Sequence, residues 1–456
     1  MIKTVHIGCG AGFMGDRFDA SLPILKSMET REGPKYLMFE VLAERTLAVA
    51  QNLKRDDPSK CYSPYLDHYI RPALAQAKRL GVKIVSNMGA ANPIGAAQRV
   101  LEIADELGIE GVRVATVTGD DLTEILPIEQ IAAMPTIEGI GFEGRPIVAA
   151  NAYLGARPVA DAVATGADVV LVGRTTDSAL ALGPLIHEFG WEADDWDRLA
   201  YGTVTGHLLE CGGQITGCYF ADPGFKDVPG LSRAGFPIAE CRANGTFTIT
   251  KPEGTGGLVN RQTVTEQLLY EMHDPSAYLV PDVVLDCTDL QATETGPNRV
   301  EITGAKGHAA PDTLKCTVSV DGGWLGEAFM TYSGPNALAR ADLAGEIVRD
   351  RLAERGMNEP FRIETLGTLA TLDGGDASRR AARHLPTDGE YTIRVATQSV
   401  DRARAQMVVD ELMMLYCSGP AAGGGHRGSV TSQIATASIL VPRNWVEPHV
   451  KIEIHA

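Results

Sequence analysis

Short apolar segments alternate with helical patterns from residue 1 to about residue 190, and this alternation constrains the fold more than any other feature of the sequence. The predicted strands read TVHIG, YLMFEVLA, VKIVSN, VRVATVTG and ADVVLVGR, and amphipathic segments such as PALAQAKRLG and AAQRVLEIADELG lie between them. Strands that are apolar on both faces and separated by helices indicate a parallel sheet covered on both sides. The sequence therefore predicts a doubly wound, mostly parallel α/β domain.

The pattern changes after about residue 235. Alternating, turn-punctuated segments such as GTFTIT, NRVEITGAKG and YTIRVATQ follow, interrupted by helical patterns around 260–273, 336–356 and 400–416. Such a mixture is typical of an α+β domain. A chain of 456 residues also exceeds what one hydrophobic core usually serves. We therefore predict two domains, a parallel-sheet α/β domain over 1–235 and an α+β domain over 236–456.

Composition narrows the range of partners. The formal net charge of −17 repels polyphosphate backbones, and no basic stripe with interleaved aromatic residues is present, so we expect no nucleic-acid partner. The sequence has no apolar run of the roughly 18 residues that a membrane span needs, and its start, MIKTVHIGCG, does not resemble a signal peptide. We expect a cytoplasmic protein without membrane contact. Eight cysteines without a C-x-x-C pair predict reduced thiols.

Polar and glycine residues follow each predicted strand of the parallel sheet. In open α/β sheets the functional groups gather at the carboxyl ends of the strands, so we expect these residues to form the rim of an active site. They are Gly10, Gly12, Asp16 and Arg17, then Glu40, then Asn87 and Asn92, then Asp120 and Asp121, and finally Arg174, Asp177 and Ser178. Helix capping is the alternative role for Asn92, Asp121 and Asp177.

The first loop, GCGAGFMGD, matches the G-x-G-x-x-G pattern that binds dinucleotides where it opens a helix. Asp16 and Asp19 would stand where the pyrophosphate rests, and like charges about 4 Å apart repel by about 4 kcal/mol at an effective dielectric of about 20. We therefore expect no nicotinamide or flavin cofactor. The loop is predicted to be a tight turn that presents backbone N–H groups to a substrate carboxylate or thioester oxygen. Cys9 is either a nucleophile there or a packed, inert thiol.

The segment GHLLECGGQ places His207 and Glu210 three residues apart, on one face of a helix. Such a pair can ligate a metal, form an acid/base dyad or be a buried structural histidine with its partner. We predict no metal site, because no second pair at metal-ligand spacing follows.

Two glycine-rich loops lie in the carboxyl half of the chain. TKPEGTGGLVN offers Lys251 beside Gly254 and Thr255, and SGPAAGGGHRGSV offers Arg427. Either loop can form a nest of N–H groups for an anion, with Lys251 or Arg427 supplying the positive charge. Flexible surface loops are the alternative interpretation.

Together these segments resemble the acyclic terpene utilisation (AtuA-like) family. The resemblance runs from about residue 3 to about residue 445 and rests on GAGFMGDR, LAERTLA, NMGAANP, VTGDDL, ANAYLGA, VGRTTDSALALGPLIHEFGW, GHLLECGGQITGCYFADPGFKDVP, KPEGTGG and EQLLYEMHDPSAYLVPDV. It implies a role in the breakdown of acyclic terpenoids and related branched acids, a route that proceeds through acyl-CoA thioesters. It implies no particular reaction.

Our leading hypothesis is a catabolic enzyme that acts on a small branched carboxylate or its CoA thioester by addition–elimination or C–C cleavage, as a hydratase or lyase does. The proposed catalytic residues are Asp16, Asp120, His207 and Glu210. The proposed substrate-binding residues are Gly10, Gly12, Arg17, Glu40, Asn87, Asn92, Arg174, Asp177, Ser178, Lys251, Gly254, Thr255 and Arg427. Two alternatives are a non-catalytic acyl-CoA-binding assembly subunit and an NAD(P)-dependent oxidoreductase. We also expect the chain to form a homo-oligomer.

Overall fold

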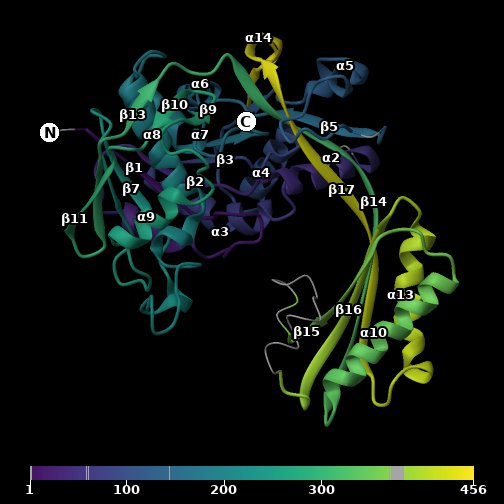
Figure 1. Ribbon diagram of the computed structural model, residues 1–456. Helices are drawn as coiled ribbons and strands as arrows, with labels where there is room; N and C mark the ends of the chain where they lie inside the picture. The colour runs from purple at the N-terminus through teal and green to yellow at the C-terminus, as the bar shows by residue number, and fades with distance from the viewer. Residues whose placement is uncertain (1–2, 58, 60, 143, 369, 371–384) are drawn as a thin grey trace. The chain divides into compact units, whose positions relative to one another are not determined.

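The computed structural model describes residues 3–57, 59, 61–142, 144–368, 370 and 385–456 (Figure 1). The chain forms two compact units. The first comprises residues 1–143, 147–319 and 436–456, and the second comprises residues 144–146 and 320–435.

A ten-stranded sheet forms the centre of the first unit. Its middle consists of five parallel strands in the order β1 (Thr4–Cys9), β2 (Lys35–Phe39), β3 (Val82–Ser86), β6 (Val169–Val172) and β4 (Val114–Thr118). Antiparallel strands extend the sheet beyond β1 through β7 (Ile238–Arg242), β8 (Phe247–Thr250), β12 (Arg299–Thr303) and β11 (Gln291–Gly296), and beyond β4 through β18 (Lys451–His455).

Helices cover both faces of the parallel strands, which confirms the predicted fold class. On one face lie α1 (Ser21–Met28), α3 (Leu66–Leu80) and α4 (Pro93–Glu106), and on the other lie α6 (Arg157–Ala164), α7 (Ala179–Phe189) and α8 (Trp196–Glu210). The strands are apolar on both sides because both sides are covered. Ile24 and Ile70, for example, are fully buried in one core cluster with Leu37 of β2. Burying a side chain of this size contributes about 1.5–3 kcal/mol.

Smaller elements complete the first unit. A three-stranded antiparallel sheet of β9 (Tyr278–Val280), β10 (Val283–Asp286) and β13 (Lys306–His308) packs against α8. Strand β5 (Ile147–Ala152) pairs with β14 (Thr313–Gly334) instead of joining the main sheet. Helices α2 (Glu44–Asp56), α5 (Ile128–Ala132) and α9 (Arg261–Leu269) and the short α14 (Arg443–Val446) lie among the connections.

The second unit has the β-α-β-β-α-β order of ferredoxin-like folds. After β14 come α10 (Ala337–Glu354), β15 (Phe361–Leu366), β16 (Gly389–Ser399), α13 (Arg402–Ser418) and β17 (Gly424–Pro442). Its strands run in the spatial order β15, β16, β14, β17. Both helices lie on one side of the sheet (Figure 1), where Val348 and Leu412 are fully buried in a separate core cluster.

The boundary between the two compact units does not lie near residue 235, where the domain boundary was predicted; the first unit continues to residue 319. Residues 236–319 belong to the first unit, because β7 pairs with β1 and carries the main sheet onward. The predicted glycine-rich loop at SGPAAGGGHRGSV is partly strand, since β17 begins at Gly424.

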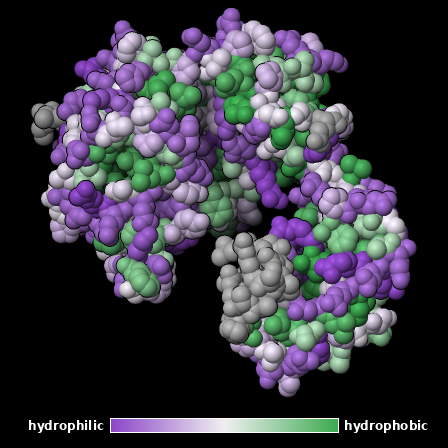
Figure 2. Space-filling model, viewed as in Figure 1, coloured by the Kyte–Doolittle hydropathy of each residue, from purple (hydrophilic) through white to green (hydrophobic). Residues whose placement is uncertain are grey.

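None of the described helices combines the length and the apolarity that crossing a bilayer requires. Hydrophilic and apolar residues are interspersed on the face shown in Figure 2.

Candidate functional site

A cavity of about 630 Å³ lies in the first unit, at the edge of the main sheet where the carboxyl ends of β1, β2 and β6 lie. The cavity is lined mainly by the loops after β1 and β2, the start of α7 and the end of α8. Its acidic residues are Asp16, Glu40, Glu44, Asp177, Glu210 and Glu271. Arg17 is the only lysine or arginine among the described residues that line it. The predicted rim is therefore acidic.

The loop after β1 is a tight turn that uses its own N–H groups. Gly10 N–H donates to the Met38 carbonyl at 2.8 Å, and Gly12 N–H donates to Asp16 Oδ2 at 2.9 Å. Asp16 Oδ1 accepts the Arg17 N–H at 2.7 Å, so both carboxylate oxygens brace the loop. Helix α1 begins only at Ser21, and the G-x-G-x-x-G stretch therefore does not open a helix as the dinucleotide fingerprint requires.

Glycine is needed at positions 10 and 12 because other chain segments approach closely. A Cβ atom at Gly10 would lie 2.6 Å from the Phe39 ring. One at Gly12 would lie 2.2 Å from the Cys211 carbonyl carbon, just beyond the end of α8. These two glycines let the first loop pack against β2 and the end of α8, and this packing brings the loop to the cavity.

Glu40 follows β2 and is a buried carboxyl held by hydrogen bonds. Its Oε1 accepts from Asn87 Nδ2 and from the Leu42 N–H, both at 2.9 Å. The Asn87 side chain also accepts the Val41 N–H at 2.8 Å, so Asn87 positions the Glu40 turn. Burial first, and the nearby negative charge of Asp177 second, raise the pKa of Glu40 to about 8. This carboxyl can therefore hold its proton at neutral pH.

Arg174 follows β6 and is bound by oxygen atoms of the chain itself. Its guanidinium donates to the Thr175 carbonyl at 2.8 Å and also to the Leu42 carbonyl and to Asp177. The ring of Tyr153 lies 4.3 Å from the guanidinium carbon. Only 1% of the Arg174 side chain is exposed. Arg174 therefore holds the loops after β2 and β6 together, and its guanidinium does not line the cavity.

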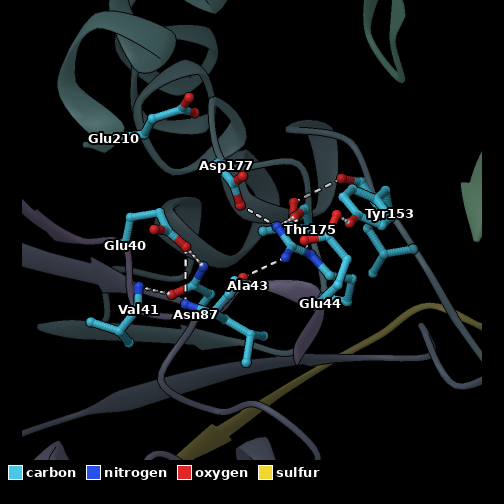
Figure 3. Close-up of polar contacts among 12 residues, drawn as sticks. Glu40, Val41, Ala43, Glu44, Asn87, Tyr153, Thr175, Asp177 and Glu210 are labelled. Carbon is cyan, nitrogen blue, oxygen red and sulfur yellow. Dashed lines mark hydrogen bonds and ion pairs between the residues drawn. The ribbon is translucent and has the colours of Figure 1, made fainter. Parts of the chain in front are cut away.

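Two carboxylates, Asp177 and Glu44, interact with the charge of Arg174; both are labelled in Figure 3. Burial and the negative charge of Glu210 raise the pKa of Asp177, while Arg174 opposes the shift. For Glu44, burial is outweighed by a hydrogen bond from Tyr153 and by the charges of Lys315 and Arg174, which lower the pKa to about 2. The cavity therefore holds carboxyls with different proton affinities, the arrangement that acid/base catalysis uses.

His207 and Glu210 lie near the end of α8, as predicted. His207 Nδ1 is 3.1 Å from Glu210 Oε1, and Nε2 is 3.0 Å from the Leu268 carbonyl. Burial disfavours the charged imidazole, but Glu210 outweighs it and raises the pKa of His207. The histidine is 1% exposed and does not line the cavity, whereas Glu210 does. His207 can therefore act only through Glu210.

Comparison with the models of known protein families shows to which family this chain belongs. The model of the family described as "Acyclic terpene utilisation family protein AtuA" matches residues 5–452, nearly the whole chain. The chain belongs to the acyclic terpene utilisation family. Membership confirms the resemblance and implies a role in acyclic terpene utilisation. No curated protein and no solved structure matches the chain.

Asp120 of this family member is buried and is not part of the cavity lining. Its Oδ2 accepts the Arg174 N–H at 3.0 Å and Asn151 Nδ2 at 2.8 Å. Burial raises its pKa to about 6. Because Asp120 does not line the cavity, its position supports a role in fixing the turn after β6 more than the catalytic role predicted from the sequence.

Several other predicted residues lie away from the cavity. Asn92 caps α4 by accepting the Gly95 N–H at 2.8 Å, and Asp121 accepts the Thr123 N–H at 3.0 Å, so both fill the alternative role of a cap. Ser178 is buried, and its hydroxyl has no hydrogen-bond partner among the described residues.

The two predicted anion nests also lie outside the cavity lining. Lys251 Nζ donates to the carbonyl of Thr255 at 2.8 Å, so this ammonium group closes its own loop, which includes Gly254. Arg427 is exposed on β17, in the second unit.

Cys9 is fully buried, and burial raises the pKa of its thiol well above the usual range. This geometry favours the inert thiol over the nucleophile.

A second cavity of about 390 Å³ lies beside the first, and apart from Asp177 none of its lining residues was among the predicted site residues. This second cavity shares Glu44, Asp177 and Glu271 with the first, and its other walls are largely apolar and aromatic. Tyr153, one of these wall residues, directly follows β5, whose apolar run IVAANA was not among the predicted strands. Glu271 has a φ of 57°, an uncommon backbone conformation for a residue with a side chain. Such strain often accompanies functional sites.

The described residues do not form a cluster of three or more metal-ligating side chains suited to a metal ion. The cavity carboxyls instead bond to backbone N–H groups, to Asn87 and to Arg174. What the arrangement offers chemically is a set of proton donors and acceptors beside an apolar space.

Proposed function

We propose that this family member is a catabolic enzyme that performs acid/base chemistry on a small branched carboxylate or its CoA thioester. The reaction is the addition or elimination of water, or the cleavage of a C–C bond, as in hydratases and lyases. One observation carries the proposal: Glu40, Asp177 and Glu210, from three separate elements, border one cavity (Figure 3).

The carboxyls suit the two halves of such a reaction. A general acid must be protonated at working pH, and the raised pKa of Glu40 meets this need. Glu210, paired with His207, is the general base in our proposal, because His207 Nδ1 at 3.1 Å can stabilise its charge. Asp177, held by Arg174, borders the same cavity and supports positive charge that develops on the substrate.

The two cavities together suit a branched substrate with a polar reacting end. The apolar walls of the second cavity include Leu279, Val280 and Leu314, which can accept a hydrocarbon branch. Glu44, Asp177 and Glu271 line both cavities, so the reacting carbon would lie beside them. We place the anionic end of the substrate near Arg17, whose side chain is 36% exposed.

Growth of a strain that needs this gene to use an acyclic terpenoid acid tests the proposal. We expect Glu40→Gln, Asp177→Asn and Glu210→Gln each to slow growth, because a positioned acid or base contributes about 10²–10⁴-fold to rate. Glu110→Gln, an exposed carboxyl far along the chain from these residues, is the matched control and should grow normally. Unimpaired growth of all three cavity variants, at normal protein levels, would refute the catalytic claim.

A further inference from the structure

The outer edge of β17 is an open strand edge in the second unit. Strand β17 is the last strand in its sheet order, so one of its edges has no partner strand among the described residues. From residue 436 onward the same strand is covered within the first unit, where the Ile137 N–H donates to the Ser438 carbonyl at 2.7 Å. The open portion is therefore 424–435. In an antiparallel strand, alternate N–H and C=O groups along such an edge point outward without partners.

This open edge lacks the features that usually prevent pairing. The segment 424–435 reads GGHRGSVTSQIA, with no proline and with Arg427 as its only permanently charged residue. The opposite edge strand, β15, has six residues and carries Arg362 and Glu364. Short, charged edges discourage edge-to-edge association, whereas long edges of small residues invite it. The β15 edge of this sheet is therefore protected against strand pairing, whereas the β17 edge is open to it.

Apolar side chains flank the same edge. On α13, Met413 and Tyr416 are 51% and 54% exposed, and their spacing of three residues places them on one helix face. The Tyr416 hydroxyl accepts the His426 N–H at 3.0 Å, which places this face beside β17. The open edge and the apolar helix face thus form one continuous surface.

We propose that this surface is a homodimer interface, at which β17 of one chain pairs antiparallel with β17 of a second copy about a twofold axis at Val430. A twofold interface must be self-complementary, with each residue i facing a residue j and the reverse. Because directly opposed side chains share a face of the sheet, the two numbers must have the same parity, and an axis at Val430 satisfies this condition. It pairs residues 427–433 with themselves, because Gly425 has a φ of 65° and is not extended, and because the His426 N–H is bound to the Tyr416 hydroxyl.

The side chains that this register opposes are compatible. Gly428 and Val430 face α13, since a Cβ at Gly428 would lie 2.5 Å from Val409 and Val430 packs against the helix-covered core. Ser429 and Thr431 are exposed on the other face and would lie opposite each other across the axis. Cross-strand pairs of hydroxyl residues are favourable. Arg427 would face Gln433, so no like charges meet.

The register makes a charge-swap test possible. The variant Ser429→Lys/Thr431→Lys places lysine opposite lysine twice across the axis, whereas Ser429→Lys/Thr431→Glu places lysine opposite glutamate. Both variants change the same two exposed residues, so the second is a matched control for effects on folding. Circular dichroism and thermal melting check that both remain folded.

The readout is the mass in solution, from sedimentation velocity and light scattering over a wide concentration range. We expect the native chain and the Lys/Glu variant to be dimers of the 48.6 kDa chain, and the Lys/Lys variant to be monomeric. Hydrogen exchange should also be slower at 427–433 in the dimers than in the monomeric variant. A monomeric native chain, or two variants of equal mass, would overturn the proposal, and in the latter case a different surface or partner is involved. Neither result bears on the carboxyls of the first unit.

Discussion

Glu40 shows how a single carboxyl can be tuned by its surroundings. It is 9% exposed, lies among other carboxylates and accepts hydrogen bonds from Asn87 and Leu42. Its pKa is raised from an ordinary value of 4.5 to about 8, so between these values the folded chain binds one proton more than the unfolded chain. The stability contributed by this group is therefore fully present below about pH 4.5 and is lost as the pH rises through about 8.

Glu40→Gln should flatten this pH dependence. Glutamine keeps a side-chain oxygen for the two hydrogen bonds but cannot ionise. Between pH 5 and 8 we expect the unfolding free energy of the native chain to fall more steeply than that of the variant, by up to about 1.4 kcal/mol per pH unit. Urea denaturation at several pH values measures this slope, and Glu110→Gln provides the baseline. Parallel slopes for the native chain and Glu40→Gln would show that Glu40 is ionised throughout.

Arg174 shows where sequence reasoning about residues stops. Its place after a parallel strand was readable from the sequence, and so were the positions of Glu40 and Asp177. Its role was not readable, because the carbonyls of Leu42 and Thr175 reach its guanidinium only in the folded chain. Lys251 is a similar case, since its own loop occupies its ammonium group. The polar residues at the strand ends could thus be located from the sequence. Which of their side chains remain free to bind a ligand could not be predicted.

At the scale of elements, the loop after β1 depends on close backbone packing. Gly12 lies against the end of α8, and a methyl group there would overlap the Cys211 carbonyl carbon at 2.2 Å. At Gly15, by contrast, an added Cβ would meet only the edge of the Phe13 ring at 3.2 Å, and Phe13 is 61% exposed and can move. The two glycines belong to the same motif, but only Gly12 lacks room for a side chain.

Gly12→Ala should therefore destabilise the chain by about 1–3 kcal/mol, the cost typical of overpacking, and should weaken the proposed activity. Gly15→Ala should change the unfolding free energy by less than about 0.5 kcal/mol. Thermal or urea unfolding of the two variants makes the comparison. Equal effects of the two substitutions would argue against the close approach between the first loop and α8.

The parallel strands were predictable as elements because burial on both faces leaves a continuous Val- and Ile-rich signal. The antiparallel strands β8 and β12 lie within the predicted segments GTFTIT and NRVEITGAKG. Their place in the main sheet was not predictable, since the pairing of Val5 with Cys241 joins segments more than two hundred residues apart. Strand β5 has a local signal, the apolar run IVAANA, but its pairing with β14 outside the main sheet cannot be read from that run. Long-range pairing of this kind leaves no local periodicity to detect.

At the scale of the whole chain, each compact unit has its own core. Leu25 is fully buried in the first unit, and Leu412 is fully buried in the second. A leucine-to-alanine change in a core typically costs about 2–5 kcal/mol. If the cores are energetically separate, each variant should loosen only its own unit.

Hydrogen exchange with mass spectrometry can separate these effects. We expect Leu412→Ala to speed exchange within 320–435 while β1, β2 and β3 are unchanged, and Leu25→Ala to do the reverse. The two variants serve as controls for each other. Faster exchange throughout the chain in both variants would mean that the two units unfold as one.

The most direct test of the central claim is deuterium transfer from solvent to substrate carbon. Purified protein is incubated in deuterium oxide with a panel of branched unsaturated acids and their CoA thioesters, and carbon-bound deuterium is measured by NMR. Addition of water, C–C cleavage and proton abstraction beside a carbonyl can each place solvent deuterium on carbon. We predict incorporation by the native chain and a loss of about 100-fold or more in Glu40→Gln and Glu210→Gln. Undiminished incorporation in both variants, or none by the native chain with any member of the panel, would contradict the assignment of this acidic cavity as a catalytic site.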